Sequence, residues 1–443
     1  MRLPFFNRKK ENSEADILLA LDIGTEFVKA VLFQFDTQDK KILVKGYGRS
    51  KQNSNAMQGA MIINLENVIN TCDHAIGNAL AHADRVENDR RKKDFKEKTD
   101  KDSGKPDRKD KKSGNPEGYE PYQTPLPNKV IIGIAGELVK GITIMADYER
   151  ENSNAKIDDK EINEVVQHIK KQAFTDAVSD IAEEIGLPAD SLIEINTKIN
   201  STYIDGVKVD DPLGFTGKEV AYRIFSTFAP RIHVNSLKEI ARHLSLEVLS
   251  IEVEPYAITR AVKSGRKKDY SAILLDIGGG TTDVALVDKG AIAGTKMFAF
   301  GGRVFTKRLA VDFKLELNEA ERTKLEYASG KMGHTREDEI RKSLNKDIST
   351  WTEAVELALA EIEDIREYPG VIYICGGGSA LPEMREGLLQ HPWLQVLPFL
   401  KYPKVEYLYP SQLEDILDTT RTVVDPADIA PLALARMYLE LEH

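Results

Sequence analysis

The sequence predicts an α/β protein with two similar lobes and a smaller α+β unit inserted into the first lobe. The chain has 443 residues, more than one hydrophobic core usually supports. A short apolar strand that ends in an aspartate and a glycine turn occurs twice, at Ile17–Gly24 and at Ala272–Gly280. Between the two copies, Val130–Thr227 alternates strand-like and helix-like patterns.

Composition excludes several classes of protein. There are 61 Lys and Arg residues against 71 Asp and Glu, giving a net charge of -10. Nucleic-acid binding needs a basic surface, so we expect no nucleic-acid partner. Cys72 and Cys375 are too few for a disulfide framework or a metal cluster, which favours a reducing cytoplasm. No apolar run approaches eighteen residues and no signal peptide is present, so we expect no membrane span.

The second hairpin carries the strongest chemical signal. Strand Ala272–Leu275 ends at Asp276, and a glycine turn leads into a second strand, Asp283–Val287. Backbone N–H groups of such a turn can form a nest for phosphate oxygens, and threonine hydroxyls can add donors; the residues concerned are Gly278, Gly279, Gly280, Thr281 and Thr282. A carboxylate beside phosphate makes sense if Mg²⁺ lies between them. A glycine-rich hairpin without a ligand is the alternative.

The first hairpin repeats this pattern, with Asp22, Gly24 and Thr25 followed by strand Val28–Phe35. Two facing nests could hold one nucleotide between two lobes. A third short strand, Val371–Cys375, ends in another turn made of Gly376, Gly377, Gly378 and Ser379, and Gly301 and Gly302 form a further turn.

Helical periodicity predicts helices at Asn64–Ala81, Asp158–Ile185, Ser236–Leu244, Glu319–Ser329 and Thr335–Glu367. Asp425 and Pro426 suit the N-cap and first position of a final helix, in which Ile429, Leu432, Ala433 and Met437 would share one face.

The segment Asp84–Pro127 mixes charges with Gly, Pro and Ser and has almost no apolar residues, which predicts a disordered, solvated loop. Binding of an acidic partner by its lysines is the alternative. At the start, Met1–Lys10 sets Leu3, Phe5 and Phe6 beside basic residues, a pairing suited to an anionic membrane, although a disordered start explains it too.

These patterns predict the following organisation: 1–14 tail, 15–83 first lobe, 84–127 loop, 128–232 inserted unit, 233–269 first lobe, 270–424 second lobe with a reduced subdomain at about 311–350, and 425–443 a helix that packs on the first lobe.

Three glycine turns in this order resemble the phosphate and adenosine motifs of the actin, heat-shock chaperone and sugar-kinase ATPase superfamily, whose fold has two ribonuclease-H-like lobes. Within it, YIDGVKVDDPLGFTGKEV (Tyr203–Val220) is similar to the inserted subdomain of FtsA, the bacterial actin-like protein that tethers FtsZ to the membrane. The stretches GAMIINLENV (Gly59–Val68), LLDIGGGTTD (Leu274–Asp283) and AERTKLEYASG (Ala320–Gly330) agree with FtsA.

This resemblance implies roles for residues of the chain. It implies that ATP phosphates are held by Gly24, Thr25 and Gly278–Thr282, and that Asp22 and Asp276 organise Mg²⁺ through water. It implies that Glu321 and Lys324 border the adenosine and that Gly376, Gly377, Gly378 and Ser379 lie beneath the base; Gly302 is a further nucleotide-binding residue. Asp276 and Glu254 would be catalytic, with Glu254 orienting the attacking water; capping of the next helix is the other interpretation of Glu254.

The resemblance implies a slow ATPase that self-associates in a nucleotide-dependent way, binds FtsZ or other division proteins, and lies on the inner face of the cell membrane. We expect no amphipathic helix after His443, and Ala310–Gly376 is short for the FtsZ-binding subdomain of the family. VEPYAITRA (Val253–Ala261) is closer to PilM, so a cytoplasmic platform that binds pilus inner-membrane proteins is the alternative. A sugar kinase is a third reading, disfavoured because no sugar-binding cluster is evident.

Overall fold

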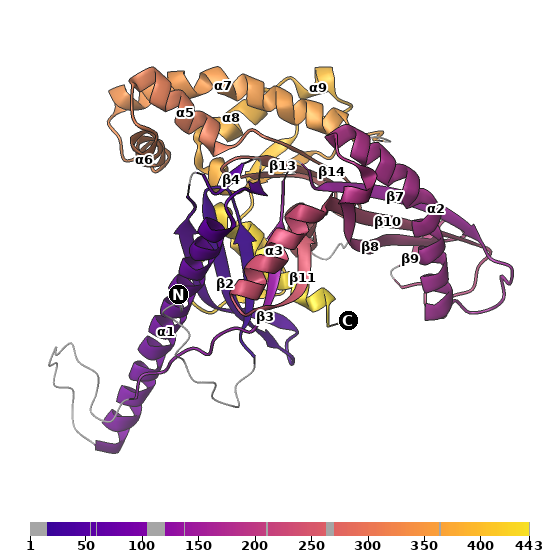
Figure 1. Cartoon of the computed structure of the whole chain (residues 1–443), viewed down its shortest axis with the longest axis horizontal. Coiled ribbons are helices and arrows are strands. Elements are labelled where there is room, and N and C mark those ends of the chain that lie inside the picture. The colour runs from indigo at the N-terminus through magenta and orange to yellow at the C-terminus, as the bar shows by residue number, and fades with distance from the viewer. Residues whose placement is uncertain are drawn as a thin grey trace.

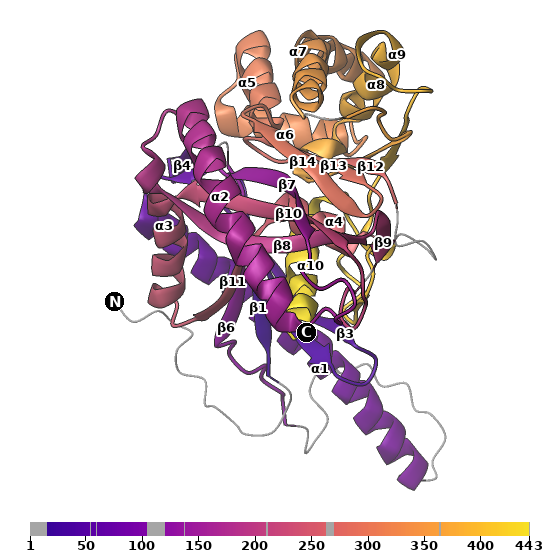
Figure 2. The ribbon, with the colours of Figure 1, turned by 90° about the vertical axis from the view of Figure 1, so that its right-hand side faces the viewer.

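A computed structural model describes residues 16–53, 55–58, 60–103, 120–136, 138–209, 211–262, 270–362 and 365–442. Its elements form two lobes, with the second lobe above the first in Figure 1 and the inserted unit projecting to the right. Figure 2 shows the inserted unit in front of the junction between the lobes. The tail Met1–Lys10 lies outside the described residues.

The first lobe is built on a six-stranded sheet. Strands β1, β2 and β3 form an antiparallel meander, and β6 and β11 add in parallel beside β1. Strand β1 is buried along its whole length, as expected of a central strand. The bounds are β1 Leu18–Ile23, β2 Phe27–Asp36, β3 Lys41–Lys51, β6 Lys129–Ile134, β11 Glu247–Val253 and β17 Ile416–Asp418.

The second lobe repeats this topology in a five-stranded sheet. Its meander β12-β13-β14 corresponds to β1-β2-β3, and β15 and β16 add in parallel as β6 and β11 do. The bounds are β12 Ala272–Ile277, β13 Thr282–Asp288, β14 Ala291–Phe298, β15 Val371–Cys375 and β16 Lys404–Tyr407. The repeat places Asp22 and Asp276 at equivalent positions, one residue before each first strand ends.

The inserted unit is a four-stranded antiparallel sheet, ordered β7-β10-β8-β9, with helix α2 packed on one face. It runs from β7 to β10, so the predicted start at residue 128 is too early: Val130–Ile134 belong to β6 of the first lobe. Sequence pattern alone does not say which sheet a strand joins. The bounds are β7 Lys140–Glu149, α2 Asp159–Ile185, β8 Leu192–Ile204, β9 Val207–Val209 and β10 Glu219–Pro230.

The inserted unit contacts both lobes. Its strand β7 lies beside β14 of the second lobe, where Thr143 Oγ1 donates to the carbonyl oxygen of Ile292 at 3.0 Å. On the first lobe, the rings of Phe225 and Tyr256 stack with centroids 5.6 Å apart. The inserted unit therefore spans the junction between the lobes.

Helices pack on the sheets of both lobes (Figures 1 and 2). A small hairpin, β4 with β5, precedes α1. The bounds are β4 Met57–Gln58, β5 Met61–Ile62, α1 Leu65–Ser103, α3 Arg231–His243, α4 Glu254–Ala261, α5 Gly302–Phe313, α6 Leu317–Ala328, α7 His334–Ala360, α8 Pro382–Gln390, α9 Trp393–Val396 and α10 Ile429–Arg436. No helix among the described residues combines the length and the apolar character needed to cross a membrane.

Helix α1 is twice as long as predicted. The disordered loop expected from Asp84 is wrong for residues 84–103, which continue α1 away from the body of the molecule (Figure 1). Lys, Arg and Glu are good helix formers, and Glu87 pairs with Arg90 and Arg91 at helical spacing. Residues 84–103 therefore form a helix although they contain few apolar residues. Residues 104–119 of the predicted loop lie outside the described residues.

The C-terminal segment returns to the first lobe. Helix α10 packs on α4 and on strands β1, β2 and β6, and it is buried almost all round rather than on the single predicted face. Asp425 stands at the N-cap position and Pro426 at the first position of a short 3-10 turn, Pro426–Asp428, as predicted, but the Asp425 side chain makes no capping hydrogen bond and α10 itself begins only at Ile429. Strand β17 pairs with β3, so the second lobe ends before Ile416 and not at 424 as expected.

Candidate functional site

The two aspartate hairpins face each other where the lobes meet. Each turn is closed by a backbone hydrogen bond, from Gly24 N to Phe27 O at 3.1 Å and from Gly278 N to Thr281 O at 2.8 Å. The turns touch at Gly279, where an ideal Cβ would lie 3.3 Å from Thr25 Oγ1 and 2.2 Å from Glu26 Cγ. Only glycine fits there. The structure therefore brings together the two turns that the sequence predicted as phosphate nests.

Carboxylates gather behind the turns. Asp22, Glu254 and Asp283 are buried, and Asp276 is partly buried. Opposite Asp22 on the neighbouring strand stands Lys29, whose Nζ lies 3.1 Å from Asp22 Oδ2 and 2.8 Å from the carbonyl oxygen of Ala427. At the equivalent position of the second lobe, the residue opposite Asp276 is Asp283. The two hairpins thus contribute three aspartates and one lysine to one site.

Burial and mutual repulsion raise the pKa values of Asp276, Glu254 and Asp283. The pKa of Asp276 is raised to about 6, mainly by burial and further by the charge of Asp22, although Lys29 opposes the rise. The pKa values of Glu254 and Asp283 are raised well above their ordinary values by burial and then by neighbouring carboxylates. Burial lowers the pKa of Lys29, but the charges of Asp22 and Asp276 raise it on balance. The site therefore has excess negative charge that a cation would relieve.

Lys29 is the site residue that sequence reasoning missed. The pattern predicts the strand Val28–Phe35 but assigns no role at the site to its lysine. Pairing the two strands of the hairpin from the turn outwards would have placed Lys29 opposite Asp22, since a tight turn fixes the register. This positive charge lies among the carboxylates and behind the turns.

Glu254 lies at the first position of α4, directly after β11. The N-cap of α4 is Val253, and no side chain caps this helix, so capping by Glu254 is wrong. Its carboxylate lies against Gly133, where an ideal Cβ would be 2.6 Å from Oε1. Buried and without a capping bond, Glu254 is available to orient a small ligand such as water.

A second group of predicted residues meets at the start of α5. Lys324 Nζ donates to the carbonyl oxygen of Gly302 at 3.0 Å and to Thr306 Oγ1 at 2.8 Å, and it pairs with Glu321 Oε2 at 2.8 Å. Gly302 N in turn donates to Gly278 O at 2.9 Å. These contacts connect the predicted adenosine residues to the phosphate turn of the second lobe.

The third glycine turn lies beside the second. Gly376 has a φ of 82° and an ideal Cβ there would lie 2.1 Å from Asp276 Oδ1, so glycine is required on both counts. Gly376 N donates to Pro426 O at 3.0 Å, which ties the turn to the C-terminal segment. The hydroxyl of Ser379 donates to Gly376 O at 2.7 Å and is buried, so it serves the turn itself.

The hydroxyl of Thr282 forms hydrogen bonds within the second lobe and not with the predicted phosphate. It donates to the carbonyl oxygen of Phe300 at 2.6 Å and accepts from Trp351 Nε1 at 3.1 Å. Both partners belong to the second lobe, and the residue is completely buried. The expectation that this hydroxyl contacts a phosphate is therefore wrong; Thr282 closes the turn by pairing with Ile277.

Within the part of the chain that the structure describes, no three His, Cys, Asp or Glu side chains are grouped so as to hold a metal ion by themselves. Magnesium, however, commonly binds through one or two carboxylates together with waters and phosphate oxygens. Asp22 and Asp276, which flank the turns in an environment of excess negative charge, fit this second arrangement.

Comparisons with known proteins find relatives of this chain. The family model described as "Cell division protein FtsA" matches residues 273–419. FtsA of Neisseria meningitidis serogroup B is 25% identical over 308 residues, which cover 69% of this chain and 60% of the relative. FtsA of Pseudomonas aeruginosa is 24% identical over 314 residues, covering 70% and 61%. The chain thus spans about three fifths of the length of these relatives. A chain of the PilM-PilN type IV pilus biogenesis complex shares the fold with a TM-score of 0.56 at 15% identity, covering 94% of this chain and 97% of that one.

The chain is thus similar in sequence to FtsA and shares its fold with a PilM chain. The predicted two-lobed actin-like fold is thereby confirmed, and the topology that the two sheets share is its duplicated core. As an FtsA-like chain, it places its paired aspartate hairpins between the lobes.

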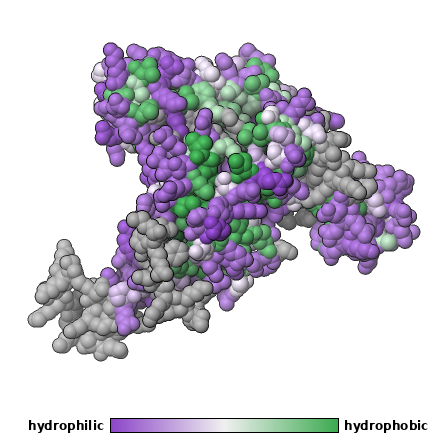
Figure 3. All heavy atoms as spheres, in the orientation of Figure 1, coloured by the Kyte–Doolittle hydropathy of each residue, from purple (hydrophilic) through white to green (hydrophobic). Residues whose placement is uncertain are grey.

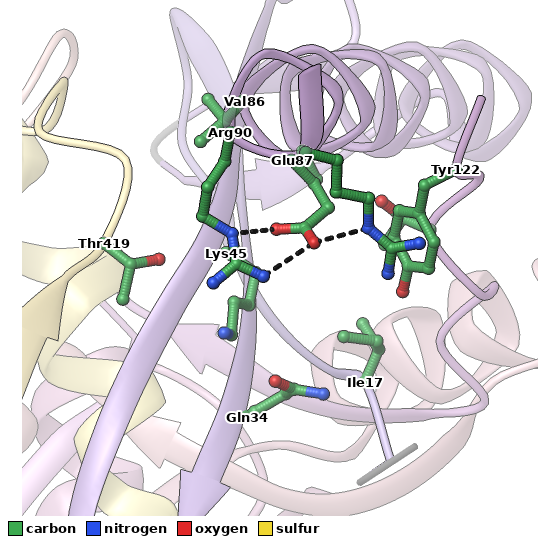
Figure 4. A pocket seen from close by; sticks show the side chains of 11 residues that line it. Ile17, Gln34, Lys45, Val86, Glu87, Arg90, Tyr122 and Thr419 are labelled. Carbon is green, nitrogen blue, oxygen red and sulfur yellow. Dashed lines mark hydrogen bonds and ion pairs between the residues drawn. The ribbon is translucent and has the colours of Figure 1, made fainter. Parts of the chain in front are cut away.

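A separate hollow of about 360 Å³ lies between α1 and the strands β2 and β3 of this FtsA-like chain (Figure 4). Glu87 accepts hydrogen bonds from Arg90 and Arg91 at its rim, and the guanidinium of Arg91 lies 4.0 Å from the ring centroid of Tyr122. None of the residues predicted for the site lines this hollow. It is distinct from the glycine turns.

A more apolar hollow of about 660 Å³ lies where α1, α3 and the inserted unit meet, and Leu65, Leu187 and Ile232 are among the residues that line it. Ile232, which lines the hollow, is 69% exposed, and Ile63, two residues before Leu65, is 61% exposed. In Figure 3, apolar side chains gather on this face around β4, β5 and the start of α3. The FtsA-like chain therefore has an exposed apolar surface away from its glycine turns.

Proposed function

We propose that the chain binds ATP with Mg²⁺ between its lobes and works as an FtsA-like scaffold. The observation that carries the nucleotide site is the pair of facing glycine turns with Asp22 and Asp276 behind them. Backbone N–H groups of the turns would receive the phosphates, and Lys29 would add positive charge beside them. Lys324 and Glu321, tied to Gly302, would border the adenosine.

Hydrolysis would be an in-line transfer of the terminal phosphoryl group to water. The water oxygen attacks phosphorus, the bond to the bridging oxygen breaks, and ADP leaves with that oxygen. Glu254 would orient the water through a hydrogen bond to its carboxylate and hold the proton that the water loses. Bound Mg²⁺ would supply charge stabilisation for the phosphate oxygens, held by water near Asp22 and Asp276. We expect turnover to be slow, as in a switch that reports nucleotide state.

As a scaffold, the chain would self-associate in a nucleotide-dependent way and link division proteins, FtsZ among them, to the inner face of the cell membrane. The matches to FtsA over about 70% of the chain support this role. Peripheral contact with the membrane would run through Met1–Lys10 or through a partner.

Calorimetric titration with ATP tests the nucleotide site. Wild-type protein should bind ATP in a Mg²⁺-dependent way, and Asp276→Ala should lose the Mg²⁺-dependent part. Asp288→Ala, at the far end of the same hairpin, is the matched control and should bind normally. Absence of binding by the wild type, or wild-type behaviour of Asp276→Ala, overturns the assignment.

A platform for a pilus inner-membrane protein is the second candidate. The fold likeness to a chain of the PilM-PilN complex and the apolar surface at Ile63 and Ile232 favour it. Affinity purification from membranes separates the two roles: co-purification of FtsZ supports division, and recovery of pilus proteins without FtsZ supports the platform. Vesicle co-sedimentation of the whole chain against a chain starting at Ser13 tests the membrane contact, with equal binding excluding the N-terminal segment.

A further inference from the structure

Glu26 and Arg303 connect the two lobes directly across the glycine turns. Arg303 Nε lies 2.6 Å from Glu26 Oε1, and Arg303 Nη2 donates to the carbonyl oxygen of Thr25 at 2.9 Å. Glu26 and Thr25 belong to the turn of the first lobe, between β1 and β2. Arg303 belongs to α5 of the second lobe. One guanidinium therefore bonds two acceptors on the opposite lobe.

Arg303 is itself fixed to the turn of the second lobe. Its backbone N–H donates to Gly279 O at 2.7 Å, and Gly302 N donates to Gly278 O at 2.9 Å. The side chain of Glu26 lies on Gly279, where no Cβ fits. Glu26, Gly279 and Arg303 thus form one contact that holds the two turns together.

This contact bridges the two turns that would hold the phosphates. With Thr25 and Glu26 in contact with Gly279, there is no room for a phosphate group to pass between the turns. If nucleotide reaches the proposed site between the turns, this contact is the one that would have to open. The side chains of Arg303 and Glu26 are 28% and 22% exposed. Solvent therefore weakens this ion pair without abolishing it.

We propose that Glu26 and Arg303 form an ionic clasp between the lobes that sets the rates at which nucleotide enters and leaves. The proposal rests on the nucleotide site proposed above. It assigns no role to either residue in the chemical step. The clasp is a gating contact, and its loss should speed exchange in both directions with a smaller effect on affinity.

Stopped-flow release of a fluorescent ATP analogue from the full chain, chased with unlabelled Mg-ATP, tests the gate. Glu26→Gln and Arg303→Gln should each speed release by about fivefold, the size expected for loss of one partly exposed ion pair. The double variant should release no faster than either single variant, because both remove the same contact. Arg308→Gln is the control: Arg308 is on the same helix and pairs with Asp347 within the second lobe, so release should not change.

Other outcomes contradict the clasp. Unchanged release in both single variants, or additive effects in the double variant, excludes a shared gate. Weaker binding by Arg303→Gln alone, with Glu26→Gln unaffected, assigns Arg303 to direct phosphate contact instead.

Cross-linking of nucleotide-free protein tests the contact without relying on ATP binding. The double variant Glu26→Cys, Arg303→Cys should cross-link within the chain when treated with a short bismaleimide. The pair Glu26→Cys, Arg308→Cys should not, and the native Cys72 and Cys375 are buried and should not react. If the wild type binds no nucleotide, the proposed function fails, but cross-linking still shows whether Glu26 and Arg303 are in contact. Absence of a cross-link in the Glu26→Cys, Arg303→Cys variant contradicts the clasp.

Discussion

Lys29 Nζ lies 3.1 Å from Asp22 Oδ2, at the centre of a group of carboxylates drawn from both lobes. Lys29 also donates to the carbonyl oxygen of Ala427, so it joins the first hairpin to the C-terminal segment. A buried charge that loses its partner is costly. The pair therefore has a structural role as well as a place in the nucleotide site.

Replacing Lys29 by Met should destabilise the nucleotide-free protein by about 3 kcal/mol, because Asp22 is left buried without its counter-charge. Urea unfolding followed by far-UV circular dichroism measures the change. The double variant Asp22→Asn, Lys29→Met should recover much of the loss, since neither charge then remains unpaired. Equal stability of the single and double variants contradicts this account of the pair.

The raised pKa of Asp276 predicts proton release on nucleotide binding. Near pH 6 this carboxyl is partly protonated in the free protein, and nearby Mg²⁺ would favour the ionised form. Affinity should therefore rise as pH increases through 6. Calorimetry in two buffers of different ionisation enthalpy measures the protons released. Because phosphate also titrates near pH 6, the informative quantity is the difference between wild type and Asp276→Asn.

The same pKa shift predicts how stability depends on pH. A carboxyl whose pKa is higher in the folded state binds more protons there, so this group makes stability fall as pH rises from about 4 to about 6. Asp276→Asn should remove this contribution and stabilise the nucleotide-free protein above pH 6, by at most about 3 kcal/mol. Below pH 4 the two proteins should be nearly equal. Thermal melts at pH 4 and pH 7.5 provide the comparison.

The sequence predicts the two hairpins because each is formed by residues that are neighbours in the chain. An apolar strand, an aspartate and a glycine turn are adjacent in sequence, and the topology of both lobes follows from repeating that unit. The position of Lys29 opposite Asp22 also follows from the sequence, but only when the two strands of the hairpin are paired from the turn outwards. In contrast, nothing in the sequence near Thr282 indicates that its hydroxyl forms hydrogen bonds with Phe300 and Trp351 instead of with a ligand.

Other differences came from non-local structure. Strand β6 has the pattern of a buried strand in any sheet, and only the assembled lobe shows that it pairs with β1. For Asp84–Ser103, low apolar content predicts disorder and helix propensity predicts a helix; the helix forms because this segment extends α1, which Val68 and Cys72 already anchor in the core. Glu26 and Arg303 belong to different lobes, so no local sequence pattern predicts the ion pair between them.

Glu254→Gln should separate binding from hydrolysis. The amide keeps the size of the side chain and cannot ionise, so ATP should bind as well as or better than in the wild type. Hydrolysis in a single turnover should fall by about 100-fold, since the amide cannot take the proton of the attacking water. Glu252→Gln is the control, because Glu252 is equally buried but accepts a hydrogen bond from Asn196 outside the site. Equal rates for Glu254→Gln and wild type exclude Glu254 from the reaction.

Gly376→Ala tests whether the third glycine turn supports Asp276. At φ 82° any side chain is strained, and the added methyl group would meet the carboxylate oxygen of Asp276. We expect a loss of about 1 to 3 kcal/mol in stability and much weaker Mg-ATP binding, measured by unfolding and calorimetry. Gly377→Ala is a close control, because its Cβ would point into open space within the same turn. If both variants bind Mg-ATP alike, the turn does not position Asp276; if only Gly376→Ala fails, this glycine maintains the position of the carboxylate on which the nucleotide site depends.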